Sequence, residues 1–287
     1  MSFAQGRNAP EEHQGDSSGT VAPTALLPHM RDAAERAAEF IRRHVTGVGE
    51  LTWEHKGPAD FVSLVDRGAE ETIRERLLGA FPNAVFLGEE TYDPAASLGA
   101  DLAFVVDPLD GTTNFLHGFP WYAVSIAATH AGEPVAGVVL NVPTGEEFSA
   151  AAGGGAWREV DGRREHIRVS ANDAPARALV GTGFPFKGID RIDEYLRQFA
   201  AITRQAAGIR RPGAAALDLC DVACGRFDAF WELTLAPWDI AAGIVIIREA
   251  GGIVTDLAGA PPRVAHTGLV AGGPAMHAWL MDTLRNA

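Results

Sequence analysis

The chain has few cysteines and no long apolar run, and both absences restrict its class. Its 287 residues include two cysteines, Cys220 and Cys224, which is too few for a disulfide framework. Lying one helical turn apart, they are expected to be small buried hydrophobic residues. No stretch of 18 predominantly apolar residues could span a bilayer, and the N-terminus lacks a basic-then-apolar secretory pattern. We therefore expect a cytoplasmic protein that does not associate with membranes.

Basic residues are also scarce, with 24 Lys and Arg against 37 Asp and Glu, for a net charge of −13. This balance argues against direct binding to the phosphate backbone of nucleic acids. Common catalytic motifs are missing as well: there is no Walker A loop, no H-E-x-x-H and no G-x-S-x-G. The segment "GTGFPF" (181–186) begins like a dinucleotide-binding loop but ends in Phe186 instead of glycine.

The apolar residues that are present, 47% of the chain, are enough for a large core. Residues 1–22 are mostly polar and contain Gly, Ser and Pro, which predicts a disordered tail. Residues 23–287 are predicted to form one domain, with possible sub-domains at 23–180 and 181–287. No internal repeat or low-complexity linker separates them, so we expect two sub-domains, if present, to pack closely.

Hydrophobic periodicity predicts mixed secondary structure. Apolar positions at helical spacing predict helices, and short apolar runs bounded by turn residues predict strands. Helices followed by a long strand-rich middle and then more helices indicate a layered α/β or α+β fold. The predicted helices are 27–45, 63–78, 190–207, 213–225, 236–250 and 274–284; the predicted strands are 84–88, 102–106, several within 122–157, 166–170 and 177–183.

The stretch "DPLDGTTNF" (107–115) concentrates acidic groups and hydroxyls immediately after an apolar strand. Pro108 keeps the residue before it extended, and Gly111 permits the backbone angles of a tight bend. Asp107 and Asp110 repel each other when held this close, and a hard divalent cation such as Mg²⁺ removes that cost. The residues after the bend can open a helix whose free N–H groups attract an anion. Cation and anion sites side by side suit a phosphate ester.

On this stretch alone, an ordinary Asp-Pro-x-Asp-Gly surface turn remains an alternative. Two further segments favour a site. "GEE" (88–90) places Glu89 after a second short strand, and "PWDIAAG" (237–243) places Asp239 at the start of an apolar helix. Asp239 could instead simply cap that helix. If the strands before Glu89 and Asp107 are neighbours, their carboxylates converge at one edge of a sheet.

Taken in order, the motifs resemble the inositol monophosphatase family of Mg²⁺-dependent, lithium-sensitive phosphatases, especially its bacterial inositol-1-monophosphatase branch. The resemblance covers about residues 30–285 and implies an α-β-α-β-α sandwich of the sugar phosphatase type. The motifs that carry it are "KGPADFVSLVD" (56–66), "GEE" (88–90), "DPLDGTTNF" (107–115), "HGFPWYAVSIA" (117–127), "TGFPF" (182–186), "GAAALDLC" (213–220), "FDAFWE" (227–232) and "PWDIAAG" (237–243).

The resemblance also implies roles for single residues. Glu89, Asp107 and the Leu109 carbonyl would bind one Mg²⁺, and Asp107, Asp110 and Asp239 a second, with a third ion shared loosely by Glu89. Thr112, helped by Asp66, would orient the attacking water. The N–H groups of Gly111 and Thr112 would hold the phosphate, while Ala215 and Glu232 would contact the substrate alcohol. Pro212 stands where many family members have threonine or valine.

The function implied is Mg²⁺-dependent hydrolysis of a small polyol phosphate, with inositol-1-phosphate the favoured substrate and Li⁺ an inhibitor. Histidinol phosphate, fructose-1,6-bisphosphate and 3′-phosphoadenosine 5′-phosphate are the alternative substrates within the same superfamily. A different alternative is a partner protein in transcription antitermination. Family members are commonly homodimers, so the resemblance implies a homodimer here.

Overall fold

Two β-sheets with helices between and outside them build the molecule. The computed structural model describes residues 21–45, 54–57, 60–62, 64–93 and 99–287, so most of the tail expected at 1–22 lies outside the described residues. The larger sheet has the strand order β3-β4-β5-β6-β7-β8-β9, and its strands are all antiparallel neighbours except β3 and β4. Its strands are β3 (Val85–Gly88), β4 (Ala103–Asp110), β5 (Ala123–His130), β6 (Glu133–Asn141), β7 (Glu147–Ala151), β8 (Ala156–Val160) and β9 (Arg163–His166).

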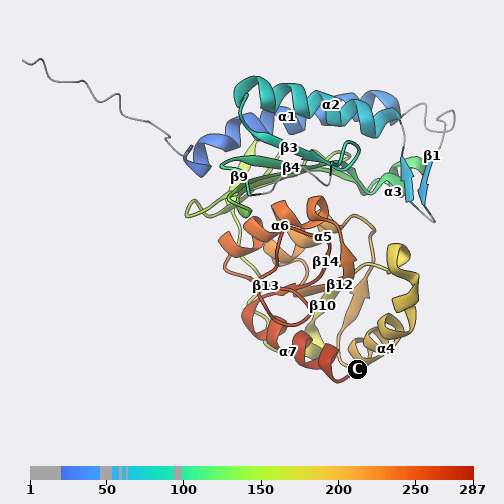
Figure 1. Ribbon diagram of the computed structural model, residues 1–287. Coiled ribbons are helices and arrows are strands. Elements are labelled where there is room, and N and C mark those ends of the chain that lie inside the picture. The colour runs from blue at the N-terminus through green and yellow to red at the C-terminus, as the bar shows by residue number, and fades with distance from the viewer. Residues whose placement is uncertain (1–20, 46–53, 58–59, 63, 94–98) are drawn as a thin grey trace, which may run out of the picture.

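The smaller sheet has the order β11-β10-β12-β14-β13 and mixes parallel and antiparallel pairs. A separate two-stranded ribbon, β1 (Glu54–Gly57) with β2 (Asp60–Val62), lies beside the short helix α3 (Thr112–Leu116) at one end of the larger sheet (Figure 1). The strands of the smaller sheet are β10 (Leu179–Thr182), β11 (Gly208–Arg210), β12 (Ala229–Leu235), β13 (Ile253–Thr255) and β14 (Thr267–Gly272).

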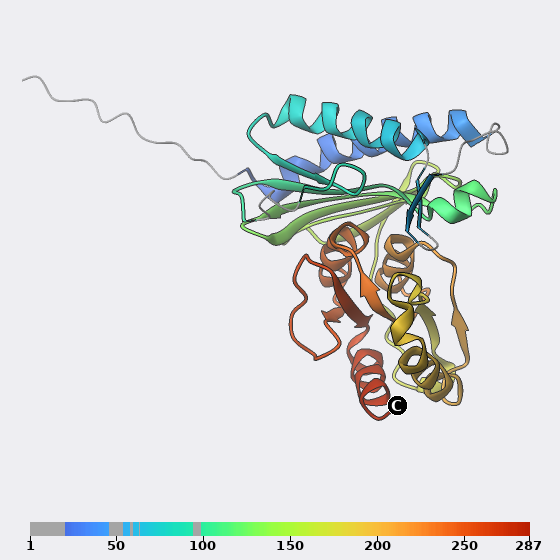
Figure 2. The ribbon, with the colours of Figure 1, turned by 45° about the vertical axis from the view of Figure 1, so that its right-hand side comes forward.

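The helices complete five layers, as Figures 1 and 2 show. Two helices cover the outer face of the larger sheet, two lie between the sheets, and two cover the outer face of the smaller sheet. This arrangement confirms the α-β-α-β-α fold. In that order the pairs are α1 (Pro23–His44) and α2 (Leu64–Ala80), α5 (Ala215–Ala223) and α6 (Pro237–Glu249), and α4 (Ile192–Thr203) and α7 (Pro274–Arg285); α3 (Thr112–Leu116) and the 3₁₀ turns η2 (Pro175–Arg177) and η3 (Phe186–Arg191) lie in connections.

The middle-layer helices α5 and α6 connect two halves of the molecule, one built on the larger sheet and one on the smaller sheet. Their backbones pack very closely. A Cβ on Gly243 of α6 would lie 2.5 Å from Leu219 Cδ1 of α5. A Cβ on Gly137 of β6 would lie 2.7 Å from the Ala242 carbonyl oxygen. These small residues let α6 approach both its partner helix and the larger sheet, which brings the N-terminal end of α6 close to the end of β4.

The predicted elements differ from the structure mainly in the second half of the chain. The prediction named no strand after residue 183, whereas β11, β12, β13 and β14 all lie there. The strand predicted at 166–170 is wrong in its position, because β9 ends at His166. The helix predicted at 190–207 is shorter, since α4 ends at Thr203 and a 3₁₀ turn precedes it.

Both cysteines are free thiols within the described chain, with Cys220 buried and Cys224 partly buried. Burial raises the pKa of each thiol, to about 11 for Cys224. This agrees with their predicted role as small hydrophobic residues. None of the helices in the described ranges is both long enough and apolar enough to cross a bilayer.

Candidate active site

Parallel pairing of β3 and β4 brings the first two predicted acids to one edge of the larger sheet. Gly88 pairs with Val106, and the Glu89 N–H donates to the Val106 carbonyl over 3.1 Å. Glu89 and Asp107 therefore follow adjacent points on neighbouring strands. The sequence prediction required these strands to be neighbours, and the pairing confirms that they are.

An irregularity in the strand pairing separates Asp107 from Asp110. Strand β4 runs through both residues, but its register with β5 shifts between them, where Pro108 cannot donate a ladder hydrogen bond. One Asp107 oxygen accepts the Leu109 N–H over 3.0 Å. The Leu109 side chain is fully buried, so this residue could contribute to a site only through its backbone. The irregular stretch places both carboxylates at the same cavity.

Gly111 turns the chain from β4 into the single-turn helix α3. Its φ of 91° lies in the left-handed region, as the bend was predicted to require. The Thr112 hydroxyl oxygen lies 2.9 Å from an Asp66 carboxylate oxygen and 3.0 Å from the Leu109 carbonyl oxygen. Asp66 is buried in the first turn of α2, so two packed elements fix the Thr112 hydroxyl.

The middle-layer helices present the remaining acid and a set of backbone donors. Asp239 is the third residue of α6, and one of its oxygens accepts the Ala236 N–H over 2.7 Å. It is thus not the N-cap residue considered from the sequence. At the start of α5, the Ala216 N–H donates to Asp110 over 2.8 Å. Ala215 is the first residue of α5.

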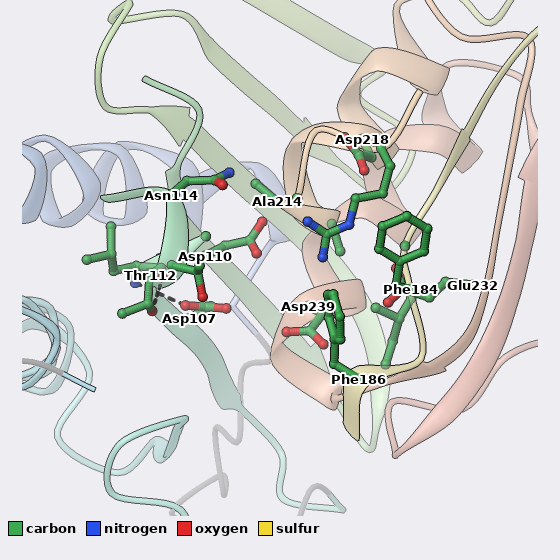
Figure 3. A pocket seen from close by; sticks show the side chains of 18 of the residues that line it. Asp107, Asp110, Thr112, Asn114, Phe184, Phe186, Ala214, Asp218, Glu232 and Asp239 are labelled. Carbon is green, nitrogen blue, oxygen red and sulfur yellow. Dashed lines mark hydrogen bonds between the residues drawn. The ribbon is translucent and has the colours of Figure 1, made fainter. Parts of the chain in front are cut away.

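These groups line one cavity of about 300 Å³ between the two halves. In Figure 3, Asp107 and Asp110 from β4 face Asp239 from α6, while Glu232 lies at the other side beside Phe184. Every residue predicted for the site lines the cavity except Asp66, which contacts it through Thr112. The lining residues are Glu89, Asp107, Leu109, Asp110, Gly111, Thr112, Thr113, Asn114, Gly183, Phe184, Phe186, Arg211, Gly213, Ala214, Ala215, Asp218, Glu232, Thr234, Leu235 and Asp239.

Burial and mutual repulsion make the ionised carboxylates unfavourable. Burial, followed by the charges of Glu89, Asp110 and Asp239, raises the pKa of Asp107 well above its ordinary value. Burial and the charge of Asp239 raise the pKa of Asp110 to about 8. Carboxyl groups packed this closely are unstable as anions unless positive charge lies among them.

The donor set fits a hard cation. The candidate ligands are carboxylate oxygens and a backbone carbonyl, which Mg²⁺ prefers over nitrogen or sulfur. Among the described residues, no three acidic, histidine or cysteine side chains converge closely enough to enclose an ion as they stand. Backbone N–H groups donate to one oxygen each of Asp107, Asp110 and Asp239, which holds these carboxylates in place at the cavity.

The family model of the inositol monophosphatase family matches residues 23–287. This chain belongs to that family. The match runs through both sheets and includes every element that lines the cavity. It confirms the resemblance inferred from the motifs and covers nearly the whole described chain.

Individual relatives carry two kinds of name. Nus factor SuhB of Pseudomonas aeruginosa is 44% identical over 88% of this chain and 93% of its own length. Inositol-1-monophosphatase of Rhizobium meliloti is 46% identical over 88% of this chain and 93% of its own length. The crystal structure of the extragenic suppressor protein suhB from Bartonella henselae superposes with a TM-score of 0.84, at 40% identity, over 92% of this chain and 99% of that one.

Several residues that line the cavity of this chain were not predicted as site residues. Asp218 of α5 is buried, and its Oδ1 has no hydrogen-bond partner among the residues that the structure describes. Burial, and then the charges of Asp110 and Glu232, raise its pKa well above the ordinary value. Asn114 donates to the Trp121 and Pro212 carbonyls, which ties α3 to the loop before α5. Asp218 lies in the quoted motif "GAAALDLC", but nothing in the sequence places its side chain at the cavity.

Proposed function

We propose that this protein hydrolyses the phosphomonoester of a small polyol, using water as the nucleophile and Mg²⁺ as the cofactor. The observation that carries the proposal is the gathering of the buried carboxylates of β4 and the partly buried Asp239 of α6 at one cavity, next to the paired Thr112 and Asp66. Membership of the inositol monophosphatase family supports the same reaction class. Inositol-1-phosphate is the proposed substrate, as the name of the Rhizobium meliloti relative also suggests.

The residues that would hold Mg²⁺ are Glu89, Asp107, the Leu109 carbonyl, Asp110 and Asp239. When bound, the cation supplies positive charge that acidifies water and neutralises the leaving alkoxide. The chain's own part is mostly positioning, because phosphoryl transfer depends largely on placement and charge stabilisation.

The chain positions the reactants through three groups of residues. The Thr112 hydroxyl, fixed by Asp66, would orient the attacking water from the β4 side. The backbone N–H groups of Gly111 and Thr112 would hold the phosphate at the turn into α3. Glu232, across the cavity from the β4 acids, would contact the alcohol, and its carboxylate can accept hydrogen bonds from the hydroxyls (Figure 3). Ala215, whose backbone N–H lies beside Asp110, would contact the alcohol as well. Water and ester thus become alcohol and inorganic phosphate, with no covalent bond to the protein.

A phosphate-release panel with purified protein tests this function. The substrates are inositol-1-phosphate, histidinol phosphate, fructose-1,6-bisphosphate and 3′-phosphoadenosine 5′-phosphate, each with Mg²⁺, with EDTA, and with Mg²⁺ plus Li⁺. We expect Mg²⁺-dependent, Li⁺-inhibited release, fastest from inositol-1-phosphate. Absence of release from all four esters at saturating Mg²⁺ would count against the proposal.

A second candidate is a role as a partner protein in transcription antitermination. The observation that favours it is the Pseudomonas aeruginosa relative named Nus factor SuhB. Pull-down of transcription elongation proteins by the tagged chain, with EDTA present to suppress hydrolysis, tests this role. We further propose that the protein is cytoplasmic, forms a homodimer and does not bind nucleic acid directly. Analytical ultracentrifugation with and without RNA measures the oligomeric state and the binding of RNA.

A further inference from the structure

Arg211 is a cation in a cavity dominated by acids. Among the described residues that line the cavity, it is the sole basic side chain, against six carboxyl groups. It lies between β11 and α5, in the loop that Asn114 ties to α3. The metal and water roles proposed above do not use Arg211, so its presence in this cavity needs a separate explanation.

Two aromatic rings fix the position of the Arg211 guanidinium. Its central carbon lies 5.0 Å from the ring centroids of both Phe184 and Phe186, within the range of cation–π attraction. The rings meet edge to face at 5.6 Å, and Phe184 packs in the same way on the buried Tyr195. A Cβ on Gly213 would lie 2.9 Å from Nη1, so glycine there leaves room for the guanidinium. Packing therefore orients this charge before any ligand binds.

The hydrogen-bonding edge of Arg211 is unused within the described chain. The side chain makes neither a hydrogen bond nor an ion pair with any described residue, although six acids line the same cavity. A guanidinium has five N–H donors, stays charged at all relevant pH values and binds phosphate oxygens in pairs. Charge-assisted bonds of this kind are about twice as strong as those to neutral hydroxyls. The charge of Arg211 does act on Asp218, whose pKa it lowers against the larger opposing effects of burial and neighbouring acids. Because its N–H groups make no bond to a described residue, the preoriented guanidinium still favours an anionic ligand.

The anion that Arg211 would bind is distinct from the phosphate proposed to be cleaved. The phosphate to be cleaved is proposed to bind the N–H groups of Gly111 and Thr112, at the turn from β4 into α3. Arg211 instead stands with Phe184 and Phe186, in the segment that borders Glu232, because a Cβ on Gly183 would lie 2.1 Å from Glu232 Oε2. The wall assigned to the substrate alcohol thus carries a fixed positive charge as well as a carboxylate.

We propose that Arg211 determines specificity by binding a second phosphate group on the substrate alcohol, so that the enzyme accepts polyol or sugar bisphosphates. This inference rests on the proposed phosphatase function and extends it to a substrate class. The second phosphate lies toward Arg211 and away from Glu232, whose charge repels it. Arg211 therefore increases the preference for bisphosphates, and Glu232 decreases it.

The test compares one alcohol with and without the second phosphate. We measure kcat/KM for fructose-1,6-bisphosphate and fructose-1-phosphate and take their ratio. Arg211→Gln is expected to lower the ratio at least tenfold, and Arg211→Lys by less, because lysine keeps the charge but lacks the planar fork. Glu232→Gln is expected to raise the ratio.

Arg210→Gln is the matched control. Arg210 is the preceding residue and is also exposed, but its guanidinium donates to the Ile209 carbonyl and it does not line the cavity. The ratio of the two kcat/KM values in Arg210→Gln should equal the ratio in the wild type. An unchanged ratio in Arg211→Gln, or an equal loss in Arg210→Gln, overturns the proposal.

Binding measurements separate this inference from the proposed function. Titration calorimetry with Ca²⁺ in place of Mg²⁺ gives the affinity of each variant for fructose-1,6-bisphosphate without turnover. A tenfold weaker affinity in Arg211→Gln alone supports the role of Arg211 even if no ester is hydrolysed. Equal affinity in wild type and Arg211→Gln contradicts it even if inositol-1-phosphate is a good substrate.

Discussion

Asp110 joins the two halves of the molecule through a single side chain. It belongs to β4 of the larger sheet, accepts the Ala216 N–H from α5 and faces Asp239 of α6. In Asp110→Asn the side chain keeps its size and can still accept the Ala216 N–H, so the fold is retained. We expect Mg²⁺-dependent phosphate release to fall by more than about 100-fold, because a neutral amide is a poor ligand for a hard cation.

Phosphate release and the thermal unfolding midpoint of the same sample measure this outcome. Asp101→Asn is the control, since Asp101 is exposed and lies two residues before the other end of β4, outside the cavity. It should retain wild-type activity. A folded Asp110→Asn protein with wild-type turnover would contradict the metal role proposed for Asp110.

The sequence contained more information about the acids than about the residues around them. Glu89, Asp107 and Asp239 each follow or begin an apolar element within a recognisable motif, so local patterning indicated them. Arg211 lies in none of the quoted motifs, and Phe186 ends the motif "TGFPF" without a site role assigned to it, because an arginine in a loop and a phenylalanine beside proline are ordinary surface or packing residues. Only the packing of η3 against the loop before α5 places these side chains together.

At the scale of elements, the middle layer depends on two very close contacts. Gly137→Ala would place a methyl group 2.7 Å from the Ala242 carbonyl oxygen and 3.0 Å from its Cα, both backbone atoms that cannot rotate away. We expect the free energy of unfolding to fall by about 1–3 kcal/mol, as measured by urea denaturation.

Gly79→Ala provides the comparison for this substitution. Gly79 lies near the end of α2, and a Cβ there would meet no described atom within 4 Å. Alanine favours a helix over glycine, so this variant should be as stable as the wild type or more stable. Equal effects of the two substitutions would argue against tight packing of α6 on β6.

The strands that the sequence did not predict share a physical cause. Strand β12, "AFWELTL", begins with a run of three buried apolar residues, because its sheet has helices on both faces, and it alternates between buried and half-buried residues only from Trp231 onward. Short apolar runs of this type cannot be distinguished from buried helix by periodicity. β14 contains two glycines, and β11 and β13 have three residues each, which is too short for a pattern. The amphipathic outer helices α1 and α2 were predicted within a few residues.

At the scale of the whole molecule, the buried acids make stability depend on pH and on cations. The pKa of Asp110 is about 8 in the folded chain and near 3.8 when exposed, so the folded state binds the proton more tightly. Its contribution to stability is complete below about pH 4 and is lost as the pH rises toward 8. The raised pKa of Asp107 and of Asp218 acts in the same direction.

We therefore expect the protein in EDTA to lose more than about 1.4 kcal/mol of stability between pH 5 and pH 8, the equivalent of one pKa unit. Mg²⁺ at pH 8 should restore it by binding the ionised carboxylates. Chemical denaturation at both pH values measures the change, and Asp110→Asn should show a smaller loss. A loss of the same size in wild type and Asp110→Asn would exclude Asp110 as a source.

The chain passes from the larger sheet to the smaller one only once in the described sequence, in the connection between β9 and β10. All strands before that connection belong to the larger sheet or the ribbon, and all strands after it to the smaller sheet. Cutting the backbone there would interrupt no strand of either sheet. The acids of the cavity come from both pieces, so a divalent cation would act as a removable link between two separately made fragments.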